Sequence, residues 1–262
     1  MSITKTLIAQ LDSILAAISM YTRLPAWRLK TLSAESYAQA INALPLVSVI
    51  TGGCMALTFY LAYSVLHLGV QVSVVLAIIS RLLLTGAFHE DGLGDFFDGF
   101  GGGRDRESIL RIMKDSHVGS YAVIAFILYY LLLNSLLVSI DHPTDIPWVL
   151  LLGDCMGKLS VLGLVNTLPY ARTEEDSKIK LVYTTHKYHI APLLTFALIL
   201  YVGQYLLSWH VSFLLLAVLF CAVLYIRYVK SRLAAYTGDT CGAMILLIEL
   251  LTILFLYIDL KE

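Results

Sequence analysis

The sequence predicts an all-α protein, a polytopic helical bundle that crosses a membrane several times. Hydrophobic residues make up 58% of the 262 residues and charged residues only 14%, whereas soluble domains carry about 25% charged residues. Several apolar stretches reach the roughly 20 residues that a helix needs to cross a bilayer. The charged residues gather between these stretches, as expected for loops outside the membrane.

Seven spanning helices are expected, preceded by an amphipathic helix near the N-terminus. The stretch "ITKTLIAQLDSILAAISMYTRLP" has apolar residues at helical spacing, interrupted by Lys5 and Asp12. This favours a helix lying in the membrane interface over an additional short span. The predicted spans are residues 43–66, 69–88, 120–140, 146–168, 190–208, 210–227 and 240–258. The chain shows no internal repeat or low-complexity linker, so residues 1–262 are expected to form one membrane domain.

Lysine and arginine alternate cleanly along the predicted topology. The N-terminal arm and the loops at 89–119, 169–189 and 227–239 carry 15 of the 18 Lys and Arg residues. The connections between the other spans carry none. Because basic loops remain in the cytoplasm, we expect these four segments on the cytoplasmic side of the cell (inner) membrane and the C-terminus on the other side.

The predicted cytoplasmic loop 89–119 is rich in acidic residues and is the candidate site. Seven of the 19 acidic residues of the chain lie between His89 and Ser120. Asp91, Asp95 and Asp98 are spaced i, i+4 and i+7, so they share one face of a helix. Three carboxylates repel one another at the edge of a membrane unless a cation neutralises them. The alternative is that the three aspartates are only solvated by water at the edge of the membrane and bind no metal ion.

Hard oxygen donors without thiols favour Mg²⁺, or Mn²⁺, over zinc. We therefore predict a Mg²⁺ site formed by Asp91, Asp95 and Asp98, with Asp115 as a fourth acid from the start of the next span. Mg²⁺ commonly completes its shell with water and substrate phosphates. Glu90 lies off the face of the three aspartates and is expected to be solvated at the interface.

Glycines and cations in the same stretch indicate a phosphate-bearing substrate. Arg111 and Lys114 are among its cations, and Lys114 could neutralise a diphosphate. Carboxylates for a metal beside cations for phosphate are the usual equipment for phosphoryl transfer. The general base could be Asp98 or His89, whose ordinary pKa lies near neutrality. On an ideal helix, His89 lies nearly opposite the three aspartates, so it would need a helix end or a kink to join them.

Five blocks of the sequence match the pattern of one known family. "HEDGLGDFFDG" at 89–99 resembles H-L-D-G-L-A-D-x-x-D-G, and "RIMKDSHVGS" at 111–120 resembles R-I-M-[KR]-D-S-x-x-G. "YTRLP" at 21–25, "LPYAR" at 168–172 and "TGDTCGA" at 237–243 match three further blocks. The blocks occur in family order over nearly the whole chain, so the sequence resembles the cobalamin synthase family, also called adenosylcobinamide-GDP ribazoletransferases. This chain departs from the pattern at Glu90, where leucine is commoner, and at His117 and Lys158, where arginine is common.

The resemblance implies an integral membrane, Mg²⁺-dependent phosphotransferase of cobalamin biosynthesis, with no nucleic-acid partner. Its reaction joins adenosylcobinamide-GDP to α-ribazole, or to its 5′-phosphate, and releases GMP. Polar residues in the matching blocks or on the same predicted face are candidate substrate contacts. They are Arg23, Arg111, Ser116, Lys158, Arg172, Thr237 and Asp239.

Two intramembrane cations have a structural interpretation. Lys158 lies one turn from Asp154 in the same predicted span, so it could form a buried pair instead of contacting substrate. Arg81 has no counterpart in the family pattern and is expected to pair with a carboxylate across the bundle.

Two other functions are compatible with clustered aspartates in a membrane protein. A CDP-alcohol-type phosphotransferase has an Ala-Arg pair after the first D-G, which "DGLGDFFDG" lacks. A divalent-cation transporter would place its acids near the middle of the bilayer on several helices. Here the acids gather at one edge of the predicted bundle, which favours the enzyme.

Overall fold

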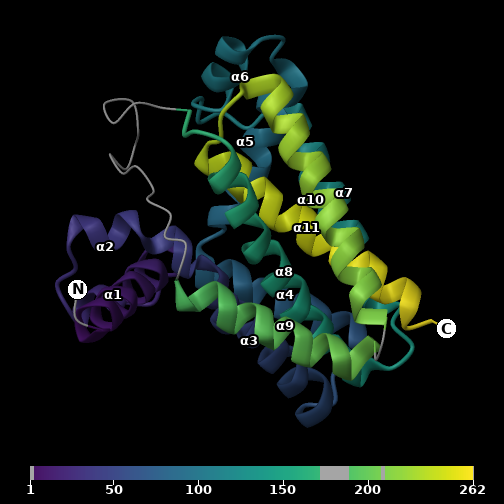
Figure 1. Ribbon diagram of the computed structural model, residues 1–262. Helices are drawn as coiled ribbons and strands as arrows, with labels where there is room; N and C mark the ends of the chain where they lie inside the picture. Colours follow the sequence, from purple (N-terminus) through teal and green to yellow (C-terminus); the bar gives the residue numbers. More distant parts are fainter. Residues whose placement is uncertain (1–2, 172–188, 208–209, 262) are drawn as a thin grey trace.

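The computed structural model describes residues 3–171, 189–207 and 210–261, and within them every regular element is a helix. The predicted all-α fold class is therefore confirmed. The main helices are α1 (Ile3–Tyr21), α2 (Ala34–Ala38), α3 (Ala40–Tyr60), α4 (Val70–Thr85), α5 (Phe88–Gly102), α6 (Arg106–Ile112), α7 (Ser120–Val138), α8 (Ile146–Thr167), α9 (Ile190–Leu207), α10 (Val211–Leu233) and α11 (Gly238–Asp259). Figure 1 shows α1 and α2 on the side of the N-terminus, with the C-terminus at the opposite edge of the bundle.

Each predicted span contains one helix, although not all of these helices are long enough to cross a bilayer. Five helical stretches in the described residues meet the requirement by length and composition. They are Ala40–Val65, Ser120–Val138, Pro143–Thr167, Ser212–Leu233 and Gly238–Asp259. The helix α4 qualifies only together with α5, and α9 is a shorter apolar helix. The described chain thus has five or six candidate spans where seven were predicted, and it is a multi-pass membrane protein.

The chain bends sharply between α4 and α5, which the sequence analysis did not predict. Gly86 and Ala87 both adopt left-handed backbone conformations, with φ of 70° and 58°, and the two helices meet at 91°. Glycine reaches positive φ without a steric penalty. The acidic stretch is therefore not the end of the second spanning helix. The segment predicted as a loop at 89–119 forms two separate helices, α5 and α6.

Close backbone contacts hold the centre of the bundle together. The helix α8 packs between α3 and α11, and glycines line both of its contacts. A Cβ on Gly52 of α3 would lie 3.1 Å from the Cα of Leu151, and one on Gly153 would lie 3.1 Å from Ile253. A Cβ on Gly157 would collide with the carbonyl oxygen of Ile245. Small residues allow membrane helices to approach closely in this way.

Replacing Gly157 with alanine is expected to destabilise the protein, because the rigid backbone of α11 cannot move aside. Overpacking of this kind costs about 1–3 kcal/mol. The matched control is Gly53→Ala, since a Cβ on Gly53 of α3 meets nothing within 4 Å. Thermal unfolding in detergent should show a lower midpoint for Gly157→Ala and no decrease for Gly53→Ala. Equal midpoints for the two variants would contradict the α8–α11 contact.

Two groups of buried ion pairs lie in the part of the bundle that the structure describes. The guanidinium of Arg81 in α4 donates to both carboxylate oxygens of Glu249 in α11, at 2.5 and 2.6 Å, and to Glu90 in α5 at 3.3 Å. The Tyr129 hydroxyl of α7 donates to Glu249 at 3.0 Å. The expected pairing of Arg81 across the bundle is confirmed. The expected solvation of Glu90 is wrong, because this residue is only 6% exposed and pairs with Arg81.

Lys158 forms the other pair, with Asp154 one turn earlier in α8. Both side chains are fully buried. The Thr51 hydroxyl of α3 donates to the second oxygen of Asp154 at 2.5 Å. The structural interpretation of Lys158 as a partner of Asp154 is confirmed.

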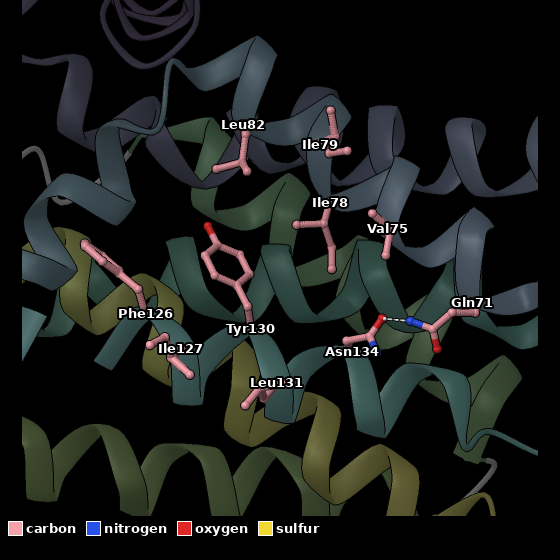
Figure 2. A pocket seen from close by; sticks show the side chains of 10 residues that line it. All are labelled: Gln71, Val75, Ile78, Ile79, Leu82, Phe126, Ile127, Tyr130, Leu131 and Asn134. Carbon is pink, nitrogen blue, oxygen red and sulfur yellow. Dashed lines mark hydrogen bonds between the residues drawn. The ribbon is translucent and has the colours of Figure 1, made fainter. Parts of the chain in front are cut away.

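An apolar groove of about 530 Å³ runs between α4 and α7 (Figure 2). Its walls include Ile79 and Leu131, which are 42% and 60% exposed. At one end, the amide of Gln71 donates to the side-chain oxygen of Asn134 at 3.0 Å. Exposed apolar side chains on spanning helices are the surface that contacts lipid.

Candidate functional site

The helix α5 carries the three aspartates of the predicted site. Its apolar residues Leu93, Phe96 and Phe100 are buried, and their i, i+3, i+7 spacing gives one core-facing stripe. Asp91 is exposed, whereas Asp95 and Asp98 are half-buried. The prediction that these three acids belong to one helix is confirmed.

The start of α11 lies directly against α5. A Cβ on Gly92 would lie 3.1 Å from the Cα of Asp239, and one on Gly242 would lie 3.0 Å from the carbonyl oxygen of His89. The two backbones approach this closely because both contact positions lack a side chain. This contact brings Asp239 beside the part of α5 between Asp91 and Asp95, as the predicted shared site requires.

The start of α11 is fixed by the segment that follows α8. Tyr170 and Tyr236 form an isolated parallel bridge. Within it, the Ala171 N–H donates to the Tyr236 carbonyl at 2.8 Å, and the Tyr236 N–H donates to the Pro169 carbonyl at 2.8 Å. Arg172, the next predicted substrate contact, lies outside the described residues.

Thr237, another predicted substrate contact, caps α11. Its side-chain oxygen accepts the N–H of Thr240 at 3.1 Å, and the Thr240 hydroxyl accepts the N–H of Thr237 at 2.9 Å. This reciprocal capping box satisfies two N–H groups at the helix start. Thr237 is fully buried, so the described geometry gives it a structural role.

Arg23 lies over the bend between α4 and α5. A Cβ on Gly86 would lie 2.7 Å from the Nε of Arg23, and the Arg23 N–H donates to the Leu84 carbonyl at 2.7 Å. The N-terminal "YTRLP" block thus contacts the beginning of the acidic stretch. Arg23 is exposed, so its guanidinium remains accessible there.

His89 is buried in the first turn of α5, with 2% of its surface exposed. Its ring centroid lies 6.4 Å from that of Tyr21 and 5.6 Å from that of Phe88. Neither ring nitrogen has a hydrogen-bond partner among the described residues. Buried polar atoms are nearly always hydrogen-bonded, so the His89 nitrogens stand out as unused donor and acceptor groups beside the site.

Asp98 and Asp115 have partners of their own. The two carboxylate oxygens of Asp98 accept the N–H groups of Gly119, at 2.6 Å, and Ala122, at 3.0 Å. One oxygen of Asp115 accepts the N–H of His117 at 3.0 Å and lies 2.6 Å from its Nδ1. Within the described part of the chain, no three His, Cys, Asp or Glu side chains are close enough to hold a metal ion together. The four-acid set Asp91, Asp95, Asp98 and Asp115 remains a prediction.

The donor chemistry of α5 nevertheless suits a hard cation. Asp91 and Asp95 lie one turn apart and offer oxygen ligands only, which is the preference of Mg²⁺. Arg111, Lys114 and Ser116 are exposed on the neighbouring segment after α5. Lys158, by contrast, is fully buried with Asp154.

The hydrogen bond between Asp115 and His117 shifts both of their pKa values. It lowers the pKa of Asp115 and raises the pKa of His117. The pair is complete only between these two pKa values. It is lost as the pH falls through the lowered pKa of Asp115, and also as the pH rises through the raised pKa of His117.

Replacing Asp115 with asparagine is expected to lower the pKa of His117 toward its ordinary value, because the negative partner is gone. Histidine NMR titration of the Mg²⁺-free protein in detergent micelles measures this shift. Histidines on other loops serve as internal controls and should titrate as they do in the unsubstituted protein. An unchanged His117 titration would show that the pair does not form in solution.

Several residues that shape this region were not predicted from the sequence. Glu249 and Tyr129 complete the Arg81 network, and Gly92 and Gly242 set the distance between α5 and α11. Glu249 had a detectable signal, since an acid within an apolar segment demands a partner. The contact between Gly92 and Gly242 had no such signal, because a single sequence does not indicate which glycines on different helices lie against each other.

Three further blocks of sequence therefore contact α5, and residues 169–171 of the remaining block pair with Tyr236 just before α11. The fold and this region together define the class of the protein: a polytopic helical membrane protein with a cluster of charged side chains on and beside α5. The chain belongs to the cobalamin-5-phosphate synthase family, whose model matches residues 13–257.

Similar proteins are found over nearly the full length of the chain. A relative from Shewanella amazonensis is 35% identical over 251 residues, which cover 94% of this chain and 95% of the relative. A relative from Vibrio cholerae is 33% identical over 251 residues, which cover 94% of each chain. Both are named adenosylcobinamide-GDP ribazoletransferase. The protein is therefore an enzyme, a transferase. No solved structure matches the chain.

Proposed function

We propose that this transferase joins adenosylcobinamide-GDP to α-ribazole, or to its 5′-phosphate, and releases GMP. Support comes from the two named relatives and from the three blocks that contact α5. The contacts between these blocks carry the proposal, because Gly99 of α5 lies against Met113 and Asp98 accepts the Gly119 N–H, so the segment that carries the exposed Arg111 and Lys114 lies against the end of α5. Such a pairing of charges suits a diphosphate and a metal ion.

In the proposed reaction, a ribose hydroxyl of the ribazole attacks the phosphorus that carries the cobinamide. A new P–O bond forms, the P–O–P bond to the guanosine side breaks, and GMP leaves with the electron pair of that bond. Arg111 and Lys114 would bind the diphosphate. Asp91 and Asp95 would hold Mg²⁺, which when bound neutralises charge on the phosphates.

The hydroxyl proton must pass to a base near α5. Of the two candidates from the sequence, Asp98 already accepts two backbone hydrogen bonds. The His89 ring nitrogens have no such partner in the described residues. We therefore assign the proton acceptor to His89.

The proposed site faces the cytoplasm, where the nucleotide substrate is found, and the membrane is the cell (inner) membrane. The four segments rich in lysine and arginine support this orientation. The described helices are compatible with it, because the start of α7, the end of α4 and the start of α11 all lie around α5.

The decisive experiment is an assay of the purified protein in detergent with Mg²⁺, adenosylcobinamide-GDP and α-ribazole 5′-phosphate. GMP release dependent on both organic substrates is expected. CMP release from a CDP-alcohol in place of this reaction would contradict the proposal, and so would Mg²⁺ flux into liposomes without any GMP.

A further inference from the structure

The third aspartate of the acidic helix caps a neighbouring helix. Gly119 is the N-cap residue of α7 and has no side chain to satisfy the first N–H groups of that helix. Asp98 supplies the missing acceptors from α5, since its carboxylate receives the N–H groups of Gly119, at 2.6 Å, and Ala122, at 3.0 Å. These two positions, N-cap and N3, are the ones that a capping box satisfies within a helix. A carboxylate also interacts favourably with the positive end of the helix dipole.

The packing around this cap leaves no room for another residue at position 119. A Cβ on Gly119 would collide with the Asp98 carboxylate. One turn earlier in α5, Gly94 lies under Phe126, because a Cβ there would be 2.6 Å from the end of that ring and 3.3 Å from the Cβ of Ala122. The first two turns of α7 therefore lie directly on α5, and the contact depends on Asp98 and Gly119 together.

We infer that Asp98 is a positioning residue, which anchors the start of α7 and thereby holds the segment from Lys114 to Val118 beside α5. This role takes the place of the metal-ligand and base roles that the sequence suggested for it. The inference rests on the proposed function insofar as the held segment contributes to the site. The "DFFDG" and "HVGS" stretches each supply one half of the contact, Asp98 and Gly119.

The substitution Asp98→Asn separates positioning from metal binding. Asparagine and aspartate are about equally good helix caps, whereas alanine is poor. Asp98→Asn keeps one of the two acceptor oxygens at α7 and replaces the other with an amide NH₂, which cannot accept an N–H, and it removes the negative charge that a Mg²⁺ ligand supplies. We expect Asp98→Asn to retain GMP release within about tenfold of the original protein, at an unchanged half-saturating Mg²⁺ concentration. Asp98→Ala should lose much more activity, and Asp98→Asn should therefore act as the conservative rescue.

A second measurement does not depend on catalysis. Lys114 is exposed in the segment that the cap holds, so tryptic cleavage after Lys114 reports opening of that segment. Loss of a cap shifts such an opening by about 5–30-fold. Cleavage, followed by mass spectrometry, should accelerate by that factor in Asp98→Ala and in Gly119→Ala, and by a smaller factor in Asp98→Asn, which keeps one of the two acceptors. The matched control is Gly238→Ala, another glycine at a helix start, whose added Cβ meets nothing within 4 Å.

The outcomes decide between the roles. An Asp98→Asn variant that is inactive, needs more Mg²⁺ and shows unchanged cleavage would overturn the inference in favour of a metal ligand. Unchanged cleavage in both Asp98→Ala and Gly119→Ala would overturn it as well. If the original protein released no GMP, the proposed function would fail, while the cleavage measurements would still decide whether Asp98 anchors α7.

Discussion

Replacing Asp95 with asparagine is expected to abolish turnover while leaving the protein folded in the membrane. Asp95 is the half-buried central acid of α5, and the proposed cation depends on its charge. Loss of one group that stabilises charge in a transition state commonly costs about 100–1000-fold in rate. GMP release by Asp95→Asn should fall by a factor in that range at saturating substrate, measured with equal amounts of purified protein.

The matched control for Asp95→Asn is Asp141→Asn. Asp141 is exposed in the connection between α7 and α8, far along the chain from the acidic helix and at the other end of α7. The Asp141→Asn variant should release GMP at the rate of the original protein. Removing Mg²⁺ with a chelator should stop GMP release by the original protein, and adding Mg²⁺ back should restore that release. Near-normal turnover by Asp95→Asn would remove Asp95 from the site.

Replacing Arg81 with leucine is expected to be the most destabilising single change in the bundle. Arg81 is 1% exposed and forms ion pairs with Glu249 and Glu90. Its removal leaves two buried carboxylates without a cation, which costs about 3–5 kcal/mol. The yield of folded protein from the membrane and the midpoint of thermal unfolding in detergent should both drop sharply.

The control for Arg81→Leu is Arg227→Leu, because Arg227 is an exposed arginine of α10. That variant should unfold close to the original midpoint. The double variant Arg81→Met/Glu249→Met should recover part of the loss, since replacing a buried ion pair with apolar side chains is often tolerated. If Arg81→Leu unfolds like Arg227→Leu, the network does not stabilise the bundle.

The Arg81 network also connects the fold to the site. It joins α4, α7 and α11 to Glu90, the residue directly before Asp91 in α5. A helix held at this point cannot rotate its acidic face away from the start of α11. Glu90 thus supplies the ionic link from Arg81 to α5 in this chain.

Several features were readable from the sequence because they depend on local pattern. Apolar length predicted the five described helices that are long enough to span a membrane, although it also predicted full spans at α4 and α9, and the spacing of Asp91, Asp95 and Asp98 predicted a common helix. The Lys158–Asp154 pair was readable as well, since residues four apart on a helix are neighbours. The bend at Gly86 was not readable, because glycine permits a left-handed backbone without requiring it.

The sequence by itself determined that this is a helical membrane protein, which family it resembles, and which acids and cations carry its charge. Those properties follow from composition, periodicity and motifs, and each of these signals can be read within a single stretch of the chain. The tertiary structure decided that the acidic stretch is a separate helix, that Asp98 contacts the start of α7, and that Glu90 is buried with Arg81. These facts depend on which distant backbones meet, and a contact between segments far apart in the chain leaves no periodic trace in either segment.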